Sequence, residues 1–429
     1  MNNSPKLIST EEVYKLLNNP DCRIIDVRSV DAYNGWRLKN EIRGGHIKNA
    51  KSLPVKWTDY IEWIEIVKSK GILPDHTIVL YGYNTEESGK VTKLFTRAGY
   101  NDIRIYNHFI KEWCSNPDLP MTHLKRYNKL VPPEWINGLI SGNTPREYNG
   151  NSYVICHAHY RNCEDYAMGH IPGAIELDTL TLESPKTWNL RTPSEIKETL
   201  ESKGISHNTT VILYGRFSYP DINDPYPGSS AGHLGAFRCA FIMMYAGVKD
   251  VRVLNGGIQS WEDAGYELTT GETEPSLIDE FGAEIPARPE LAIDVPEAKE
   301  LLESDTGDLI SVRSWLEFIG KLSGYNYIEK KGRIPGAIFG NCGSDAYHME
   351  NYRNLDYTTR EYHEIAEMWS EANILPEKHN AFYCGTGWRG SEAFYNAYLM
   401  GWPKISVFDG GWFEWSNDPN NPYETGVPE

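Results

Sequence analysis

The chain has 429 residues, of which 40% are hydrophobic and 12% aromatic, so it can fill several packed cores and is not a disordered protein. Its formal net charge of −17 argues against partners such as nucleic acid or an anionic membrane surface, and it mildly favours a cationic ligand. At about 100–200 residues per domain, we expect two to four domains.

The start of the chain lacks the apolar segment of a signal peptide, and no later apolar run is long enough to cross a bilayer. We therefore expect a soluble, cytoplasmic protein that does not bind membranes. The seven cysteines are scattered along the chain, and no two have the CxxC spacing of a zinc ribbon. This distribution favours thiol chemistry in a reducing compartment over a disulfide framework.

The first part of the chain alternates helix-like and strand-like segments. Residues 6–17 predict a helix, with Thr10 and Val13 in a capping-box pattern and two glutamates in its first turn. Apolar runs that end in charge or glycine predict buried strands at residues 23–29, 77–83 and 102–107. Strands that alternate with helices predict an α/β fold, with a mainly parallel sheet and helices on both faces.

The same order of elements occurs three times. The matching segments of the second copy are residues 153–159, 169–174, 211–215 and 250–257, and those of the third are 308–314, 332–338, 381–384 and 404–412. We therefore expect three tandem domains at residues 5–120, 130–268 and 290–429. Polar, proline-containing stretches near residues 115–130 and 269–290 separate them.

One position distinguishes the three copies, the residue that follows the second buried strand. It is Gly82 in the first copy, Gly215 in the second and Cys384 in the third. Only the third copy retains a nucleophile, so we expect the other two to shape or cover its site. The second copy also has an insertion here, residues 216–227, whose role the sequence does not reveal.

The segment around Cys384 joins a predicted strand to a predicted helix. Gly385, Gly387 and Gly390 permit backbone conformations that turn several N–H groups toward one point, and the helix dipole adds positive potential there. A thiolate or persulfide on Cys384 would be stabilised in such a loop. A buried structural cysteine is the alternative, and the neighbouring glycines and Arg389 make it the weaker interpretation.

Residues 156–159, Cys-His-Ala-His, contain three side chains of metal-ligating types. Successive side chains of a strand point to opposite faces, so at most His157 and His159 point the same way. The segment also stands where the repeat requires a strand. We therefore expect no metal site, and we expect Cys342 and Cys114 to be structural.

Four motifs together resemble the rhodanese family of sulfurtransferases over nearly the whole chain. They are Asp-Val-Arg at residues 26–28, Gly-His-Ile-Pro-Gly-Ala at 169–174, Cys-x-x-Gly-x-Arg at 384–389 and Asp-Gly-Gly-Trp at 409–412. The resemblance implies that Cys384 carries sulfane sulfur as a persulfide. Its loop has the length of the sulfur-binding form, one residue shorter than the loop of related phosphatases.

A narrower resemblance rests on residues 156–162, 323–327, 342–354 and 384–392, which are similar to the ergothioneine-forming sulfurtransferases of anaerobic bacteria and archaea, a three-repeat branch of the family. It implies sulfur transfer from polysulfide to the imidazole C2 of hercynine, the trimethylated betaine of histidine, without a further cofactor. The partners would be these small molecules, and the oligomeric state stays open.

Two other functions remain alternatives, a thiosulfate or 3-mercaptopyruvate sulfurtransferase and a non-enzymatic sulfur-relay scaffold. Many rhodaneses carry a basic residue where this chain has Gly385, and Trp388 occupies another loop position. This difference weakens the thiosulfate interpretation, because a dianion gains from cationic side chains, and it leaves room for a flat aromatic acceptor.

Sulfur transfer to an imidazole carbon requires removal of the C–H proton and proton exchange at the ring nitrogens, so a hydroxyl or carboxylate must lie nearby. An insertion in the third copy, residues 321–331, is expected to face the loop, and Tyr325 within it is the leading proton donor. Thr386 would place a hydroxyl beside the sulfur, and Glu317 would be a proton-relay carboxylate. The alternative for Tyr325 is simple packing, for Thr386 it is capping of the loop, and for Glu317 it is a solvated helix position.

The quaternary ammonium of hercynine would lie on aromatic faces, each of which contributes roughly 0.5–2 kcal/mol. Trp388 and Trp412 are the nearest aromatic side chains, with Asp409 as a counter-charge. A Gly-Gly pair follows Asn255 in the second copy as well, which favours a structural role for residues 409–412. We expect Arg389 to close the loop by bonding its carbonyls rather than to bind the substrate carboxylate.

Overall fold

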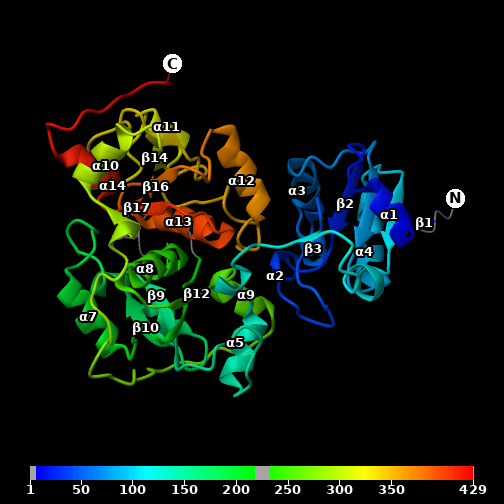
Figure 1. Ribbon diagram of the computed structural model, residues 1–429, viewed down its shortest axis with the longest axis horizontal. Coiled ribbons are helices and arrows are strands. Elements are labelled where there is room, and N and C mark those ends of the chain that lie inside the picture. Colours follow the sequence, from blue (N-terminus) through cyan, green and yellow to red (C-terminus); the bar gives the residue numbers. More distant parts are fainter. Residues whose placement is uncertain (1–5, 162, 218–231, 429) are drawn as a thin grey trace. The chain divides into compact units, whose positions relative to one another are not determined.

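The computed structural model describes residues 6–161, 163–217 and 232–428. The chain divides into two compact units, Met1–Asn128 and Lys129–Glu429 (Figure 1). The first unit contains one five-stranded sheet and the second contains two. Most of the expected insertion in the second copy, residues 218–227, lies outside the described residues.

The sheet of the first unit is parallel, with the strand order β1-β6-β5-β2-β4. Its strands are β1 (Lys6–Leu7), β2 (Cys22–Asp26), β4 (Lys51–Ser52), β5 (Thr77–Tyr81) and β6 (Ile103–Tyr106). Its helices are α1 (Thr10–Leu16), α2 (Val30–Asn34), α3 (Trp63–Ser69) and α4 (Thr85–Arg97), and β3 (His46–Ile47) pairs with β7 (Met121–Thr122).

The first helix begins later than its sequence pattern predicts. Residues 6–7 form β1, and Ser9 is the N-cap of α1. The capping box joins Ser9 to Glu12, not Thr10 to Val13, because only the extended Ser9 directs its hydroxyl to the N–H of Glu12. The pattern therefore locates the helix and misplaces its cap.

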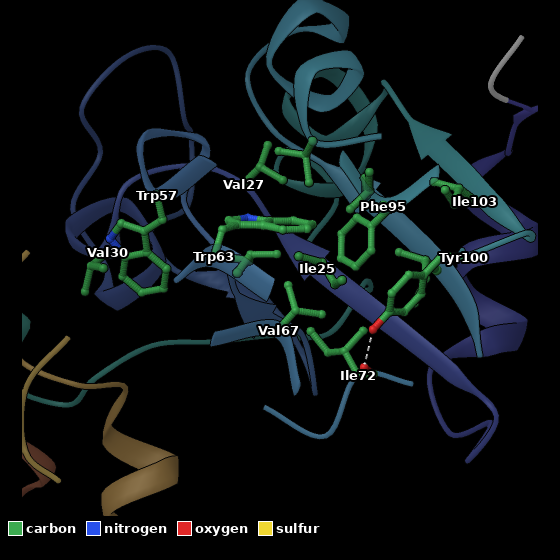
Figure 2. Close-up of a cluster of buried hydrophobic side chains, with 14 residues drawn as sticks. Ile25, Val27, Val30, Trp57, Trp63, Val67, Ile72, Phe95, Tyr100 and Ile103 are labelled. Carbon is green, nitrogen blue, oxygen red and sulfur yellow. Dashed lines mark hydrogen bonds between the residues drawn. The ribbon is translucent and has the colours of Figure 1, made fainter. Parts of the chain in front are cut away.

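One core of the first unit lies between the sheet and helices α3 and α4 (Figure 2). The rings of Trp63 and Phe95 meet edge to face with centroids 5.0 Å apart, and Phe95 meets Tyr100 in the same way at 4.8 Å. The hydroxyl of Tyr100 is buried and donates to the carbonyl of Ile72 at 2.6 Å. Burial of strand residues on both faces explains the nearly continuous apolar run of β5.

The second unit repeats this strand order twice, as β8-β12-β11-β9-β10 and β13-β17-β16-β14-β15. The first of these sheets contains β8 (Leu130–Val131), β9 (Tyr153–His159), β10 (Ile175–Asp178), β11 (Thr210–Tyr214) and β12 (Asp250–Leu254). The second contains β13 (Ala292–Ile293), β14 (Gly307–Ser311), β15 (Ile338–Phe339), β16 (His379–Tyr383) and β17 (Ile405–Phe408). We call these parts of the unit the second and third repeats, and the first unit the first repeat.

The helices of the second repeat are α5 (Pro133–Ile140), α6 (Glu164–Met168), α7 (Pro193–Ser202), α8 (Gly232–Ala246) and α9 (Gly257–Asp263). Those of the third are α10 (Val295–Leu302), α11 (Trp315–Phe318), α12 (Tyr362–Glu371), α13 (Trp388–Met400) and α14 (Gly411–Asn417). Helix α8 packs along α13 (Figure 1), with the rings of Phe241 and Phe394 5.4 Å apart. Because α8 is covered by its own sheet and by α13, it is apolar on nearly all sides.

The predicted α/β class is confirmed, since all the strand pairs within the three five-stranded sheets are parallel. Strands β5, β11 and β16 occupy the same central place and end at Tyr81, Tyr214 and Tyr383. The three residues that follow them are the predicted glycine, glycine and cysteine. In the described residues, no helix is both long and apolar enough to span a membrane.

Candidate active site

The loop after β16 begins at the fully buried Cys384. The carbonyls of Cys384 and Gly385 accept hydrogen bonds from the N–H groups of Trp412 and Phe413, at 2.8 and 2.9 Å. Within the described chain, the N–H groups of residues 385–387 donate to no protein acceptor. Helix α13 begins directly behind them, so these donors and the helix N-terminus form a site for negative charge on a sulfur atom.

Two loop positions accept only glycine. Gly387 has a φ of +94°, in the left-handed region, and is the N-cap of α13. A Cβ atom on Gly385 would lie 2.2 Å from Cε2 of the Tyr325 ring. The ring of Tyr325 therefore occupies the space that a basic side chain at this position would need, which explains the absence of that side chain in physical terms.

In each of the other two repeats, an N–H group at the start of the corresponding loop bonds to a side chain of the protein. In the first repeat, the N–H of Tyr83 donates to the carboxylate of Glu87 at 3.2 Å. In the second, the N–H of Gly215 donates to Nδ1 of His233 at 3.3 Å. These loops lack the nucleophile and also bond to groups of the protein itself.

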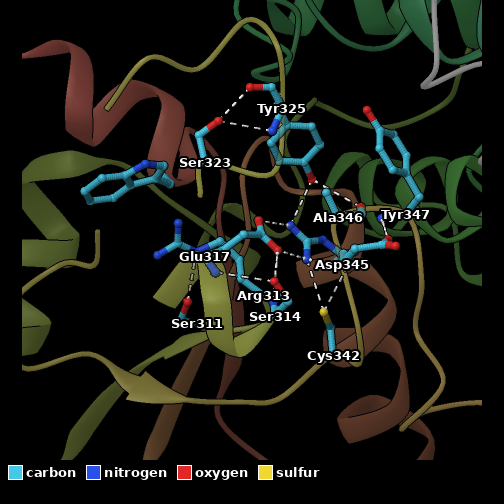
Figure 3. Close-up of polar contacts among 12 residues, drawn as sticks. Ser311, Arg313, Ser314, Glu317, Ser323, Tyr325, Cys342, Asp345, Ala346 and Tyr347 are labelled. Carbon is cyan, nitrogen blue, oxygen red and sulfur yellow. Dashed lines mark hydrogen bonds and ion pairs between the residues drawn. The ribbon is translucent and has the colours of Figure 1, made fainter. Parts of the chain in front are cut away.

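Arg389 is the centre of a buried hydrogen-bond network. Its partners Glu317, Tyr325 and Cys342 are labelled in Figure 3. Its Nη2 and Nη1 donate to the two carboxylate oxygens of Glu317 at 2.8 and 3.0 Å. Nη2 also donates to the hydroxyl of Tyr325 at 3.0 Å, and Nη1 to the sulfur of Cys342 at 3.1 Å. Arg389 therefore does not bond the loop carbonyls as expected, because Glu317, Tyr325 and Cys342 take its donors and are held in place by it.

The charges in this network are fixed by burial and pairing. Burial opposes ionisation of Glu317, but the Arg389 charge outweighs it and lowers the pKa of the carboxyl below its usual value. Glu317 is thus an ionised partner of Arg389, and its proton-relay role stays a prediction. Burial raises the pKa of Tyr325 well above its usual value despite Arg389, and it raises the pKa of Cys342 to about 12. Both groups are protonated at neutral pH.

An aromatic cluster, Tyr160, Trp188, Tyr325, Tyr327 and Trp388, lies beside the loop. Tyr327 is stacked between Tyr325 at 5.2 Å and Trp188 at 4.5 Å. Trp388 meets Tyr160 edge to face at 5.4 Å, and the indole N–H of Trp188 donates to the Tyr160 hydroxyl at 3.1 Å. Negative charge on Cys384 acts on both Tyr325 and Tyr327, so the sulfur lies near these two rings.

The other predicted site residues fall into two groups. Thr386 lies two residues after Cys384 in the loop, and its side chain is near Tyr327. Trp412 instead lies fully buried in the core of the third repeat. Its indole N–H donates to the carbonyl of Lys330 at 3.0 Å. Asp409 accepts hydrogen bonds from Arg238 at 2.6 Å and from the N–H of Leu190 at 2.8 Å. The structure therefore does not bring Trp412 or Asp409 into the aromatic cluster.

Several residues of the site were missed from the sequence. Tyr327 has a weak signal, since it lies two residues after Tyr325 in the insertion. Tyr160, Trp188, Glu183 and Arg238 come from the second repeat, and no pattern in the sequence reveals which faces of the two repeats pack together. Their contribution is seen only once α8 and α13 are in contact.

The Cys-His-Ala-His segment forms part of β9. Burial lowers the pKa of His157 to about 3, so the ring is neutral, and His159 is hydrogen-bonded to Glu176. Among the residues that the structure describes, no group of three or more histidine, cysteine or acidic side chains could hold a metal ion.

The family model of the rhodanese-like domain matches residues 9–116, 159–264 and 294–418. A structure of an EanB variant in complex with hercynine is similar over 99% of both chains, with 60% identity and a TM-score of 0.98. Another EanB variant, with a cysteine persulfide in a tetrahedral intermediate state with ergothioneine, has 60% identity, a TM-score of 0.97 and coverage of 99% of this chain and 100% of that one.

A curated relative is the thiosulfate sulfurtransferase YnjE of Escherichia coli, which is 40% identical over 415 residues, or 96% of this chain and 90% of that protein. Each matched segment contains the central strand of one of the three parallel sheets, β5, β11 or β16, and the third contains the only one of the three following loops with a cysteine at its start. The chain therefore belongs to the family of rhodanese-like sulfurtransferases.

Proposed function

We propose that this protein forms ergothioneine by transferring sulfane sulfur from a persulfide on Cys384 to the imidazole C2 of hercynine, with polysulfide as the sulfur donor. The observation that carries the proposal is the position of a protonated phenol, Tyr325, directly against Gly385 of the sulfur-binding loop. The likeness to EanB over the full length, at 60% identity and with hercynine bound to that protein, supports the same acceptor.

In the first half-reaction, the thiolate of Cys384 attacks a sulfane sulfur of polysulfide. A new S–S bond forms on Cys384, an S–S bond of the donor breaks, and the donor leaves one sulfur shorter. The N–H groups of residues 385–387, which bond no acceptor in the described chain, stabilise the negative charge of the persulfide. We propose that no bound cofactor takes part, because the donor itself supplies sulfur at the oxidation level that the transfer requires.

In the second half-reaction, a bond forms between the terminal sulfur and C2 of the imidazole, and the S–S bond to Cys384 breaks. The sulfur takes up two electrons, C2 is oxidised, and Cys384 leaves as a thiolate within the loop. The proton lost from C2 returns to the Tyr325 oxygen, which has given its own proton to the ring. The protonated hydroxyl of Tyr325 serves a ring nitrogen as proton donor, oriented by Arg389 at 3.0 Å. Thr386 provides a second hydroxyl next to the sulfur.

The trimethylammonium group of the acceptor has no hydrogen-bond donor, so it is recognised through aromatic faces and negative charge. The aromatic cluster offers five rings beside the loop, and each face that contacts a cation contributes roughly 0.5–2 kcal/mol. The cluster therefore suits a flat ring with a cationic substituent better than it suits the thiosulfate dianion.

The proposal is tested by incubating the purified protein with polysulfide and hercynine. Mass spectrometry should detect ergothioneine in solution and, when hercynine is omitted, added sulfur on the peptide that contains Cys384. The 40% identity to a thiosulfate sulfurtransferase makes thiosulfate with cyanide the necessary comparison, together with 3-mercaptopyruvate. Faster thiocyanate formation than ergothioneine formation contradicts the proposal, and the absence of any turnover favours a sulfur-relay scaffold.

Tyr325→Phe is expected to slow sulfur transfer to hercynine by roughly 10²–10⁴-fold, the usual contribution of a positioned general acid. Loading of sulfur on Cys384 should be unchanged, since the phenylalanine ring still fills the space against Gly385. Single-turnover kinetics of the loaded enzyme measure the two steps separately. Tyr423→Phe, at an exposed tyrosine, is the control and should match the wild type in both steps.

Gly385→Ala is expected to slow transfer to hercynine by about 10²-fold, because the added methyl group displaces the ring of Tyr325, and a misplacement of about 1 Å has effects of that size. Steady-state kinetics with hercynine measure the loss. Gly89→Ala on α4, where an added Cβ meets open space, should leave turnover unchanged. Normal turnover of Gly385→Ala would mean that the contact with Tyr325 is not required.

A further inference from the structure

A single buried arginine of the second repeat connects several parts of the site. Arg238 lies on α8, is fully buried, and donates from Nε to Glu183 at 3.0 Å. Its Nη2 donates to the carbonyl of Trp188 at 2.7 Å and to Asp409 of the third repeat at 2.6 Å. Since Glu183 and Trp188 belong to one segment of the second repeat and Asp409 to the third repeat, this guanidinium fixes both segments relative to α8.

Two sides of the aromatic cluster depend on these bonds. The carboxylate oxygens of Glu183 accept the indole N–H of Trp388 at 2.9 and 3.0 Å, so Glu183 sets the orientation of that ring. The backbone of Trp188 is held by Arg238, and its ring stacks on Tyr327, which in turn stacks on Tyr325. Arg238 thus acts on Trp388 through Glu183, and on the two tyrosines through Trp188.

The same side chain lies directly against the loop. A Cβ atom on Gly387 would be 2.9 Å from Nη1 of Arg238, and this nitrogen has no hydrogen-bond partner among the described residues. Along α8, Gly235 lies beside the Trp388 ring, whose nearest atom would be in ordinary contact with an added Cβ at 3.5 Å. Helix α8 therefore lies against both the loop and its tryptophan.

We propose that Arg238, together with Glu183, is a positioning residue that holds the acceptor-binding rings and the sulfur-binding loop in register. The inference rests on the proposed function in one respect, the identity of hercynine as acceptor. The second repeat then contributes to acceptor binding although its own loop has no nucleophile. Lysine cannot replace this arginine, because an ammonium on a flexible stem does not reproduce the planar fork that reaches three acceptors.

The test uses the full-length variants Arg238→Lys and Glu183→Gln. We expect the KM for hercynine to rise roughly tenfold and kcat to fall roughly tenfold, as for a buried charged hydrogen bond lost at a binding site. Mass spectrometry measures the loading of sulfur on Cys384 from polysulfide. Loading should stay within about twofold of the wild type, since Cys384 and the N–H groups of residues 385–387 are retained. A purely structural role would lower loading and kcat together and leave KM unchanged.

Arg252→Lys is the matched control. Arg252 is a second buried arginine of the same repeat, paired with Asp250 at 2.9 Å and bonded to the carbonyl of Glu147 at 2.7 Å. Its guanidinium lies over the ring of Trp135, and none of these partners belongs to the aromatic cluster. This variant should be less stable to heat and should retain the wild-type KM for hercynine.

An unchanged KM in folded Arg238→Lys or in Glu183→Gln overturns the inference, and Glu183→Gln alone decides if Arg238→Lys does not fold. Failure of the proposed function has a different signature, in which the wild type itself forms no ergothioneine. In that case cyanide serves as the sulfur acceptor for loaded protein. Because the loop is expected to stay intact, thiocyanate release from both variants should stay within about twofold of the wild type, and a larger fall in both would indicate a purely structural role and overturn the positioning role as well.

Discussion

Cys384→Ser is expected to abolish ergothioneine formation, with a fall of at least about 10³-fold in rate, because a hydroxyl cannot form the S–S bond that carries the sulfur. The serine still fits the fully buried position at the end of β16, so the fold and hercynine binding should be retained. Product analysis measures the loss of ergothioneine, and mass spectrometry of the loop peptide measures the loss of added sulfur at position 384. Ergothioneine from the folded variant at more than a trace would contradict a persulfide on Cys384.

Cys342→Ser provides the comparison for that experiment. The Cys342 thiol lies 3.1 Å from Nη1 of Arg389, and burial raises its pKa to about 12, so it is a poor nucleophile. A serine oxygen can accept the same hydrogen bond from Arg389. This variant should therefore load sulfur on Cys384 and turn over at a rate within a few fold of the wild type, a range we take from the modest net value of one hydrogen bond.

Glu317→Ala is expected to lower the free energy of unfolding of the second unit by about 3–5 kcal/mol, because it leaves the Arg389 guanidinium buried without its counter-charge. Both groups are essentially inaccessible to solvent, so water cannot replace the lost carboxylate. Urea denaturation, followed by hydrogen exchange of peptides from β16 and α13, measures the effect where it arises. Turnover should fall as well, since Arg389 also orients Tyr325.

Two further variants make that result specific. Glu290→Ala removes an exposed partner of Arg288 and should leave the unfolding midpoint unchanged, since exposed ion pairs contribute little. The double variant Glu317→Ala with Arg389→Met removes both buried charges and should regain much of the lost stability without regaining activity. If the double variant is no more stable than Glu317→Ala, the loss does not come from an uncompensated charge.

The sequence was informative wherever a local pattern determines the structure. The positions of Cys384 and Gly387 predict the loop, because the left-handed φ of +94° at Gly387 favours a residue without a Cβ. The repeated strands predict the sheets, since buried parallel strands have continuous apolar runs. Neither inference requires knowledge of which residues meet across the fold.

The errors concern contacts between distant segments. Arg389 was expected to bond its own loop, and its partners Glu317 and Cys342 lie 72 and 47 residues away in the sequence. For Trp412, the structural role that the sequence favoured agrees with its place in the core of the third repeat. The contribution of Arg238 could not be predicted, because the composition of α8 indicates burial without indicating what covers it.

The loops of the first two repeats are closed to sulfur chemistry by more than the missing nucleophile. A cysteine at Gly82 would place its Cβ 2.7 Å from a methyl group of Val27, and one at Gly215 would lie 2.3 Å from the backbone of Gly232. Glu87 and His233 also bond an N–H group of these loops. A single glycine-to-cysteine substitution therefore does not give the chain a second sulfur-carrying loop.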